Sequence, residues 1–416
     1  MRSAWQLFAR EPRARVFFAA LAQSSLGTGA SYVALLLIAY ERWHSPWSIT
    51  LILLAELAPA MLLGPVFGAA ADRWSRKGCQ IVADLVRFGA FIGIAVTGSF
   101  ELTLALALVA GCGTALFNPA ALASLPGLVS PARLPAASSV YGATYDLGFT
   151  LGPTLAAVVL LVASPEGLIF ANGATFAVSA LLLAGLSFGA TATRTDEHPS
   201  LLSETREGLA ATKGMPGLRF LLTGSAAALF FAGAFNVAEL PFAVDVLDSG
   251  NVGYSVLAAT LGIGMIAGSL LGAGGGRVGF LKRRYLMGVA VLGIGFVFSG
   301  LAPVYPTALA AFGLAGFGNG AMIVYERLLI QETVPDRLAG RVFGMKDALM
   351  AWAFGLSFIA AGAVLELAGV RAFIVGLDAG CLVVWALATR RLRGTYEESG
   401  APALSGAEAA GDRVAG

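Results

Sequence analysis

The chain has few charged residues for its length: Lys, Arg, Asp and Glu together make up 12% of 416 residues. Water-soluble domains carry roughly 25%. Hydrophobic residues make up 57% of the chain, and the mean hydropathy is +0.79. A soluble fold cannot bury that much apolar surface. The composition therefore excludes an ordinary soluble domain and predicts that a lipid bilayer surrounds most of the chain.

Residues that bind metals or act as nucleophiles are also scarce. The three cysteines, Cys79, Cys112 and Cys381, are far apart and show neither CxxC nor metal-ligand spacing. The two histidines are His44 and His198. No G-x-x-x-x-G-K-[ST] loop for nucleotide phosphates occurs, and a net charge of +2 is too small to indicate nucleic acid binding. We therefore expect no metal, no cofactor, no nucleic acid partner and no enzymatic activity.

Long apolar runs divide the chain into twelve predicted transmembrane helices. A span needs about 20 mostly apolar residues, and a longer run can tilt. The first run is too long for a signal-peptide core, so we expect it to be retained as a helix. The predicted helices are Ala14–Tyr40, Pro46–Ala71, Cys79–Gly98, Leu102–Ser124, Ala137–Ala163, Glu166–Ala190, Gly217–Leu247, Val252–Gly275, Tyr285–Ala302, Pro306–Ile330, Val342–Ala368 and Val370–Thr389.

The basic residues predict how these helices are oriented. With both termini in the cytoplasm, nearly all of the 27 Lys and Arg residues fall in or beside cytoplasmic segments, and only Arg42 and Arg371 are expected outside. One extra or missing span would reverse every later segment and destroy this asymmetry. We therefore expect a multi-pass protein of the cytoplasmic (cell) membrane with both termini on the cytoplasmic side.

The chain contains an internal repeat. A shift of 204 residues places Gly64 on Gly268, Arg73 on Arg277, and the segment 131–134 on 335–338. These matches predict two six-helix halves that bind substrate between them, near the middle of the membrane. The expected organisation is an amino-terminal bundle at 1–190, a cytoplasmic linker at 191–216, a carboxy-terminal bundle at 217–393 and a disordered cytoplasmic tail at 394–416.

The loop after the second predicted helix has the pattern G-x-x-x-D-R-x-x-R-K, formed by Gly68, Asp72, Arg73, Arg76 and Lys77. A small residue such as Gly68 lets two helices approach closely. Asp72 can face the amino terminus of another helix, and the basic residues can anchor the loop on the cytoplasmic side. The alternative interpretation is a positive loop with an incidental aspartate.

With this loop, the twelve spans and the repeat, the chain resembles the major facilitator superfamily over nearly its whole length. Segments 118–126 and 331–337 are similar to the macrolide-efflux type of drug:proton antiporters in that family. Gly148, Gly152 and Pro153 resemble the bend motif that proton antiporters of the family carry on their fifth helix. The resemblance implies alternating access, with the loop aspartate helping to hold the outward-facing state. The fourth predicted helix lacks the arginine that many members use near the proton path.

Carboxylates inside the predicted spans are the candidates for proton coupling, because an ionised one costs about 2.5–3.5 kcal/mol at mid-bilayer. At 1.5 Å per residue, Glu56 lies about 15 Å from the outer end of its helix and Asp146 about 12 Å from the inner end of its own. Glu239, just before Pro241, is nearer the outer end. Each can carry a proton or pair with a cationic substrate. The alternative for Glu56 and Asp146 is a permanently protonated acid that hydrogen-bonds a neighbouring helix, and the alternative for Glu239 is an acid that simply faces water. We expect no intramembrane Lys or Arg to balance them, which favours cationic or neutral cargo.

Neutral polar residues are the candidates for the substrate cavity: Gln23, Tyr32, Asn236 and Asn319. Hydrogen bonding between helices explains them equally well. The sequence thus predicts a monomeric secondary active transporter whose partners are protons, the bilayer and a small apolar or amphipathic substrate, such as a drug or secreted metabolite, which it exports. The alternatives are a carrier for uptake or facilitated diffusion of a nutrient or metabolite, and a membrane scaffold without transport.

Overall fold

The computed structural model describes residues 7–187, 215–271 and 277–392, and no β-strand occurs in these ranges. Two short helical turns, η1 (Pro131–Arg133) and η2 (Phe242–Val246), accompany twelve long helices. The long helices are α2 (Pro12–Trp43), α3 (Pro46–Arg73), α4 (Arg76–Val96), α5 (Phe100–Leu128), α6 (Leu134–Val159), α7 (Pro165–Ala184), α9 (Pro216–Pro241), α10 (Gly250–Leu270), α11 (Val278–Leu301), α12 (Tyr305–Thr333), α13 (Asp336–Ala368) and α14 (Val370–Leu392).

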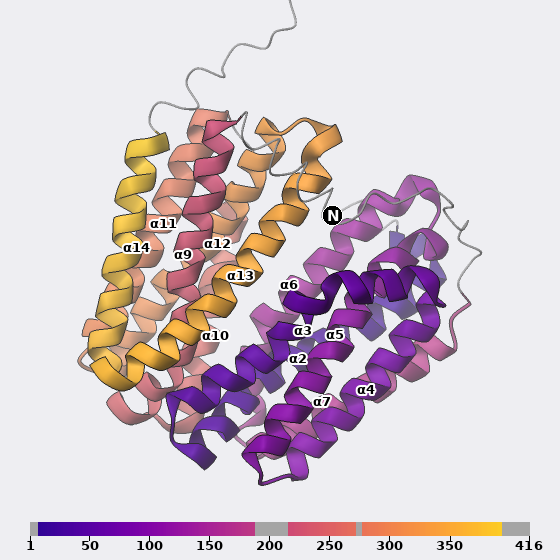
Figure 1. Ribbon diagram of the computed structural model, residues 1–416, viewed down its shortest axis with the longest axis horizontal. Helices are drawn as coiled ribbons and strands as arrows, with labels where there is room; N and C mark the ends of the chain where they lie inside the picture. The colour runs from indigo at the N-terminus through magenta and orange to yellow at the C-terminus, as the bar shows by residue number, and fades with distance from the viewer. Residues whose placement is uncertain (1–6, 188–214, 272–276, 393–416) are drawn as a thin grey trace, which may run out of the picture.

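The helices form two bundles, α2–α7 and α9–α14 (Figure 1). In the first, α2 packs on α6 and α7, and α4 packs between α5 and α7. In the second, α11 packs between α12 and α14. The first helix of each bundle begins with a proline, Pro12 or Pro216, whose fixed φ suits the first helical position. The predicted fold class, an all-α protein of two six-helix halves, is confirmed.

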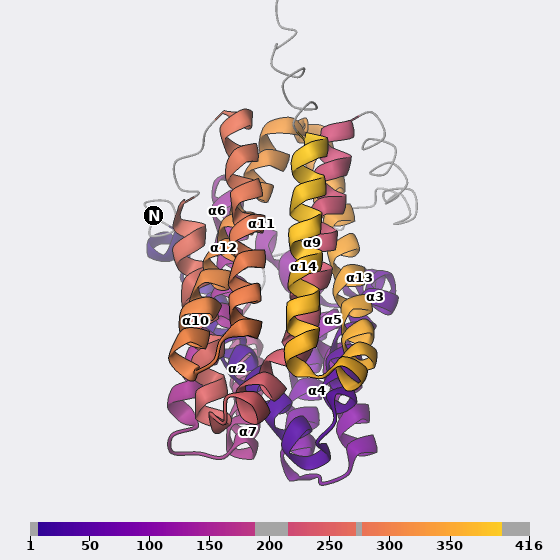
Figure 2. The same cartoon turned by 90° about the vertical axis from the view of Figure 1, so that its left-hand side faces the viewer.

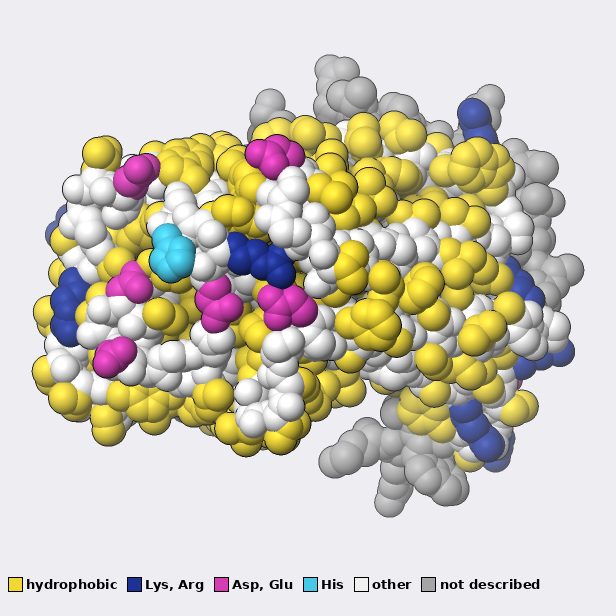
Figure 3. All heavy atoms as spheres, turned by 90° about the horizontal axis from the view of Figure 1, so that it is seen from below, with side chains coloured by type: hydrophobic (Ala, Val, Ile, Leu, Met, Phe, Trp, Pro, Cys, Tyr) yellow, Lys and Arg dark blue, Asp and Glu magenta, His cyan; other side chains and the backbone are white. Residues whose placement is uncertain are grey.

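The outer faces of the helices are apolar, as a bilayer requires. Eleven of the described helices are long and apolar enough to cross a membrane, and in α6 the apolar part is the shorter segment Thr150–Val159. Large hydrophobic side chains of the helices stand on the surface, among them Leu181 of α7 at 73% and Leu270 of α10 at 68% exposed. Figure 3, which looks onto one end of the molecule from below, shows hydrophobic side chains over much of the surface, with acidic and basic side chains and one histidine among them. The protein is therefore a multi-pass membrane protein.

Several helix ends differ from the prediction. Helix α11 begins at Val278 rather than Tyr285, since charged residues can extend a helix beyond the apolar run: Lys282 donates to the Leu392 carbonyl at 3.0 Å. The predicted helix up to Leu247 is divided at Pro241, because proline lacks the amide hydrogen that a regular helix needs. The predicted tail and nearly all of the predicted linker lie outside the described residues, and the domain limits stay a prediction.

The two bundles touch at one end of the molecule and separate at the other (Figure 1). Helix α3 packs against α13 and α6 packs against α10. Figure 2 shows the helices of the carboxy-terminal bundle running along the length of the molecule. We call the end where the bundles touch, which carries the α2–α3 and α13–α14 connections, the closed end. The other end carries the α3–α4 loop and both ends of the described chain, and we call it the open end.

Candidate substrate and proton site

Tyr32 of α2 and Asn236 of α9 meet where the two halves touch. The Tyr32 hydroxyl donates to Oδ1 of Asn236 at 3.5 Å, and the residues are 204 positions apart, the shift of the sequence repeat. Two equivalent positions can contact each other only near the axis that relates the repeats. Tyr32 lies about 17 Å from the closed end of its helix, near the middle of a hydrocarbon layer about 30 Å thick. The pair therefore marks the axis close to the middle of the membrane.

A buried carboxylate lies one helical turn beyond Asn236. Glu239 is 5% exposed, and the fully buried Tyr254 of α10 donates to its Oε1 at 2.9 Å. Tyr32 interacts electrostatically with both Glu239 and Glu56. We call these five residues, Tyr32, Glu56, Asn236, Glu239 and Tyr254, the axial cluster. The structure thus brings together four residues that the sequence analysis selected separately and adds Tyr254, which it missed.

Glu56 reaches the axial cluster from α3. A Cβ on Gly111 of α5 would come within 2.5 Å of the Glu56 carbonyl oxygen, so the glycine permits the close contact of these two helices. Counted from Pro46, Glu56 lies about 15 Å from the closed end, as the sequence predicts. None of the ion pairs formed by the described residues includes Glu56 or Glu239. The cluster can therefore take up protons or a cation without displacing a basic side chain of the described part.

Among the described residues, four hydrogen bonds join the halves on the closed side of the axial cluster. Each links α2 or α3 of the amino-terminal half to η2, α10 or α13 of the other half. The bonds are Tyr40 to Asp245, Asn251 to Glu41, Trp47 to Glu366 at 3.0 Å, and Thr50 to the carbonyl of Phe358 at 3.2 Å. Polar contact between the halves is thus concentrated on the closed side of the cluster.

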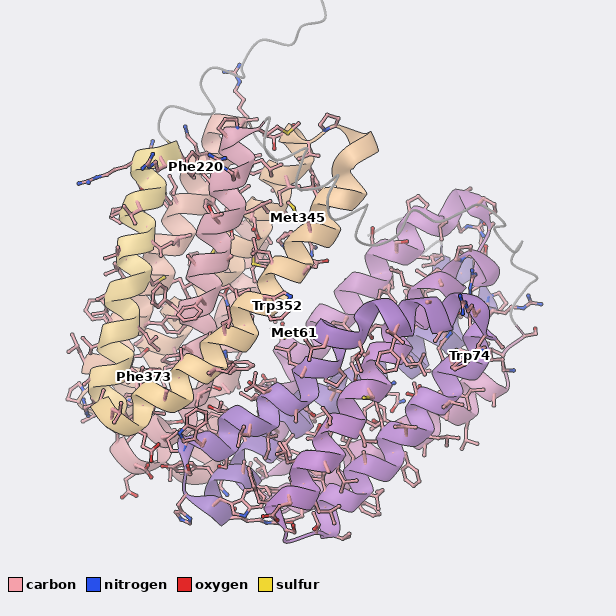
Figure 4. All side chains as sticks on the ribbon, in the orientation of Figure 1. Met61, Trp74, Phe220, Met345, Trp352 and Phe373 are labelled. Carbon is pink, nitrogen blue, oxygen red and sulfur yellow. The ribbon has the colours of Figure 1, made fainter. Side chains whose placement is uncertain are left out.

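The basic loop at the open end binds to its own half. Arg76 donates to a carbonyl of α5 at 2.7 Å, and Lys77 donates to two carbonyls at the end of α7 at 2.6 and 2.7 Å. Arg73 is exposed. Trp74 is 68% exposed and lies on the side of the amino-terminal half that faces away from the other half (Figure 4).

At this end, the face of helix α3 that carries Gly68 has no neighbour, whereas Ala71 is buried against Cys79 of α4 and Ala120 of α5. A Cβ on Gly68 would meet no atom within 4 Å, so the close approach expected there is not made in this conformation. The side chain of Asp72 lies outside the described residues. The role of the motif as a conformational gate stays a prediction.

The glycines of the predicted helix-5 motif join α6 to α2. A Cβ on Gly148 would come within 2.5 Å of the Ser25 side chain, and one on Gly152 would overlap the backbone of Gly29. Pro153 lies in the interior of α6. The motif therefore supports close packing inside the amino-terminal half, and its role in bending the helix stays a prediction.

Two of the predicted cavity residues make contacts within one half. Gln23 donates to the Thr175 carbonyl of α7 at 2.8 Å, and the Asn319 amide approaches the Met265 sulfur of α10 at 3.8 Å. Both contacts are of the helix–helix kind that the sequence left open. The proton-coupling candidate Asp146 is on α6, and its side chain lies outside the described residues.

The prediction that no basic residue balances the intramembrane acids is wrong for α4. Asp84 and Arg87 form an ion pair within this helix, with side chains 0% and 7% exposed. Arg87 lies about 16 Å from the Arg76 end of the helix, so it is not at the cytoplasmic edge where the charge count placed it. Its guanidinium carbon lies 4.4 and 4.3 Å from the ring centroids of Phe117 and Phe176. The D-x-x-R spacing, which places both residues on one helix face, is the sequence signal that was missed.

The carboxy-terminal half has a buried pair of its own. Lys346 of α13 lies 3.6 Å from Glu326 of α12, with side chains 14% and 4% exposed. Asp347, 77% exposed, lies 4.0 Å from the same lysine. Because the two buried partners are on different helices, no spacing in the sequence indicates the pair.

Two six-helix halves in a membrane, with a polar cluster on the axis between them, define a membrane transporter. A family model described as the Major Facilitator Superfamily matches residues 17–345. The chain therefore belongs to the major facilitator superfamily.

Several characterised and uncharacterised transporters are similar to it in sequence. An uncharacterised MFS-type transporter, YfiS of Bacillus subtilis, is 28% identical over 91% of this chain and 92% of its own length. The multidrug efflux pump Tap of Mycolicibacterium fortuitum is 26% identical, with 91% and 95% covered. Macrolide efflux protein A of Streptococcus pyogenes is 22% identical, with 88% and 92% covered.

Solved structures share the fold at low sequence identity. A bacterial homologue of the human lysosomal transporter Spinster, in an inward-facing and unoccupied conformation, has a TM-score of 0.71 at 14% identity, with 93% of this chain and 98% of that one covered. The nucleoside transporter NupG has a TM-score of 0.69 at 12% identity, with 92% and 99% covered.

Proposed function

We propose that this protein exports a small apolar or amphipathic compound, neutral or cationic, in exchange for protons. The observation that carries the proposal is the axial cluster, in which Glu56 and Glu239 lie beside phenols rather than beside Lys or Arg. Burial disfavours the charged form of a carboxyl group, so each of these groups retains a proton until a cation or a change of access removes it. A site of this kind on the repeat axis suits exchange of protons for cargo.

The conformation fits one stage of such a cycle. With both termini in the cytoplasm, the open end is cytoplasmic and the structure is inward-facing. Cargo then reaches the axial cluster from the cytoplasm, while the four hydrogen bonds at the closed end block the outer side. Rocking of the halves would break those bonds and bring α3 and α13 together at the open end.

Export rather than uptake is supported by the relatives that are named as efflux proteins, the pump Tap and macrolide efflux protein A. Each inward proton supplies about 2.3 kcal/mol per 100 mV, enough for roughly a fiftyfold accumulation outside. We place the protein in the cell membrane as a monomer, because each chain holds both halves that alternating access needs.

Proton movement linked to cargo tests this function directly. In energised inverted vesicles, a pH-sensitive dye reports the gradient while cationic, neutral and anionic compounds are added in turn. We expect cationic or neutral compounds to dissipate the gradient with the wild type, and Glu239→Gln or Glu56→Gln to abolish the response. Asp146→Asn is measured beside them. Glu101→Gln, which neutralises an exposed acid at the start of α5, is the matched control and should leave the response unchanged.

Other outcomes would replace the proposal. A labelled solute that equilibrates across the membrane without disturbing the gradient would show a facilitated-diffusion carrier. Uptake driven by the gradient in right-side-out vesicles would show a nutrient carrier, and the absence of any flux would favour a scaffold.

A further inference from the structure

A small cavity, lined by apolar and polar side chains, lies inside the amino-terminal half beside Arg87. Its volume is about 20 Å³, and its polar lining comes from α2, α5 and α6 through Ser24, Thr28, Thr114, Asn118 and Tyr145. A cavity of this size has room for about one water molecule. Thr28 lies one helical turn from Tyr32 on α2, so the cavity and the axial cluster are neighbours along the same helix face.

The adjacent ion pair is incompletely hydrogen-bonded. Nε of Arg87 and Oδ2 of Asp84 form no hydrogen bond of normal geometry in the described part of the chain, although both side chains are more than nine-tenths buried. The Ser179 hydroxyl of α7 is the neutral group that interacts with the Asp84 carboxyl. Leaving such a group without a partner costs about 1–3 kcal/mol. Arg87 is one of the residues that line the cavity, so a space with room for an acceptor lies beside this side chain. The pair thus has unused bonding capacity in this conformation.

Few other charges surround the pair. Helix α4 packs mainly on α5 and α7, whose acids lie in their first turns at the closed end, and the charged residues of α2 lie near its ends. The phenols of Tyr141 and Tyr145 interact electrostatically with Arg87. The acids on the neighbouring helices are Glu41 on α2, Glu56 and Asp72 on α3, Glu101 on α5, Asp146 on α6 and Glu166 on α7.

We infer that Asp84 is a proton-binding site inside the amino-terminal half and that its proton controls the position of Arg87. When Asp84 is ionised, the guanidinium bonds to it. When a proton from water in the cavity binds to the carboxylate, this attraction is lost, and Arg87 turns its N–H groups toward the oxygens of Thr28 and Asn118. The proton bonds to Asp84 and no other covalent bond changes.

The consequence for transport is a change of charge beside the axial cluster. A protonated Asp84 leaves the positive charge of Arg87 uncompensated beside the cavity that Thr28 also lines. Thr28 lies one helical turn from Tyr32, and the uncompensated charge repels cationic cargo. Proton and cargo would then exclude each other by repulsion across α2, without sharing a residue. This inference rests on the proposed proton-coupled function.

Carbodiimide labelling tests whether Asp84 binds a proton. Dicyclohexylcarbodiimide reacts with protonated carboxyl groups in apolar surroundings, and peptide mapping by mass spectrometry identifies the labelled residue. In the wild-type protein in lipid, labelling of Asp84 is expected to rise about tenfold over roughly two pH units on acidification. Arg87→Gln should leave Asp84 labelled at every pH, whereas Arg87→Lys, which keeps the counter-charge, should retain the pH dependence.

A constant, low level of labelling in the wild type, together with strong labelling in Arg87→Gln, would overturn the inference and show a permanent ion pair. If the reagent labels Asp84 in neither the wild type nor Arg87→Gln, pH-difference infrared spectra can show whether Asp84 binds a proton. A protonated-carboxyl band that appears on acidification in the wild type and is missing in Asp84→Asn supports the inference, and identical spectra overturn it. Because no cargo is present, these results are independent of the vesicle assay, and either proposal can fail without the other.

Discussion

The two halves repeat one arrangement of helices, but equivalent positions have different surroundings. Gly64 of α3 and Gly268 of α10 match in the repeat. A Cβ on Gly268 would overlap the Phe317 carbonyl of α12, whereas a Cβ on Gly64 would meet no atom within 4 Å. The glycine at this repeat position therefore allows close helix packing in the carboxy-terminal half, whereas in the amino-terminal half it has no neighbour, at the open end. The difference shows that the relative position of the halves decides what a repeated residue touches.

The two halves differ more clearly in the positions of their buried charged residues. Asp84 and Arg87 correspond in the repeat to Gly288 and Val291, and Glu326 corresponds to Leu122. The amino-terminal pair lies within one helix near mid-membrane, and the carboxy-terminal pair links two helices. The repeat therefore preserves the packing scaffold, while each half acquired its own ionisable groups.

The largest expected effect contrasts these two pairs. Asp84→Ala would leave Arg87 buried without a counter-charge and should lower the free energy of unfolding by about 3–5 kcal/mol. Glu326→Ala should cost less, because its partner Lys346 is already 14% exposed at its side chain and can turn toward water. Thermal unfolding in detergent measures both. Asp84→Asn combined with Arg87→Gln should recover most of the loss, and an equal loss in both alanine variants would contradict the ranking.

The glycine comparison predicts the next effect. Gly268→Ala should destabilise the protein by roughly 1–3 kcal/mol, because the added methyl group forces α10 away from α12. Gly64→Ala, the same change at the equivalent position, should stay within about 0.5 kcal/mol of the wild type. Unfolding curves recorded under one detergent condition compare the two directly. Equal destabilisation would mean that α3 packs tightly at the open end in solution.

Contacts between the halves predict a smaller effect, on conformation rather than stability. Thr50→Val removes the hydrogen bond to the Phe358 carbonyl, worth about 1 kcal/mol, and should shift the equilibrium away from this conformation about fivefold. Spin labels at Trp74 and Asp347, in a background without the native cysteines, should show more of the short open-end distance. Thr223→Val, which removes a bond within one exposed helix turn, is the control and should leave the distances unchanged.

The smallest effect concerns a contact that the other half lacks. Glu11, just before α2, accepts a hydrogen bond from the Ser130 amide at 3.1 Å and pairs with Arg133, and the repeat places Met215 at the equivalent position. The Ser130 amide, with a further contribution from Arg133, holds the pKa of Glu11 below its usual value. The stabilisation is therefore present above the unfolded-state pKa and is lost as the pH falls through the lower folded-state value.

Glu11→Gln should accordingly cost no more than about 1 kcal/mol near neutral pH, since the pair is partly exposed. It should also remove this part of the acid dependence of unfolding, measured as the melting temperature against pH. An unchanged acid dependence would show that Glu11 makes no such contribution.

Much of the fold and part of the axial cluster could be predicted from the sequence. Four residues of the axial cluster could be predicted, because a polar side chain is costly to place inside an apolar span and therefore indicates a function or a contact between helices. They are Tyr32, Glu56, Asn236 and Glu239. Tyr254 could not be predicted, because tyrosine is common in helices and only the structure shows that its hydroxyl donates a hydrogen bond to Glu239. Arg87 was missed because the basic residues were counted by segment, which hides one that lies in the middle of a helix.

By itself, the sequence determined the number of long helices and their grouping into two related halves, because apolar runs of membrane-spanning length and a constant shift are properties of the chain alone. Only the tertiary structure decided which polar groups meet. Most of the helices are apolar nearly all round, so periodicity leaves their rotation about their own axes unspecified. The contact of Tyr32 with Asn236 depends on that rotation, and packing against neighbouring helices fixes it.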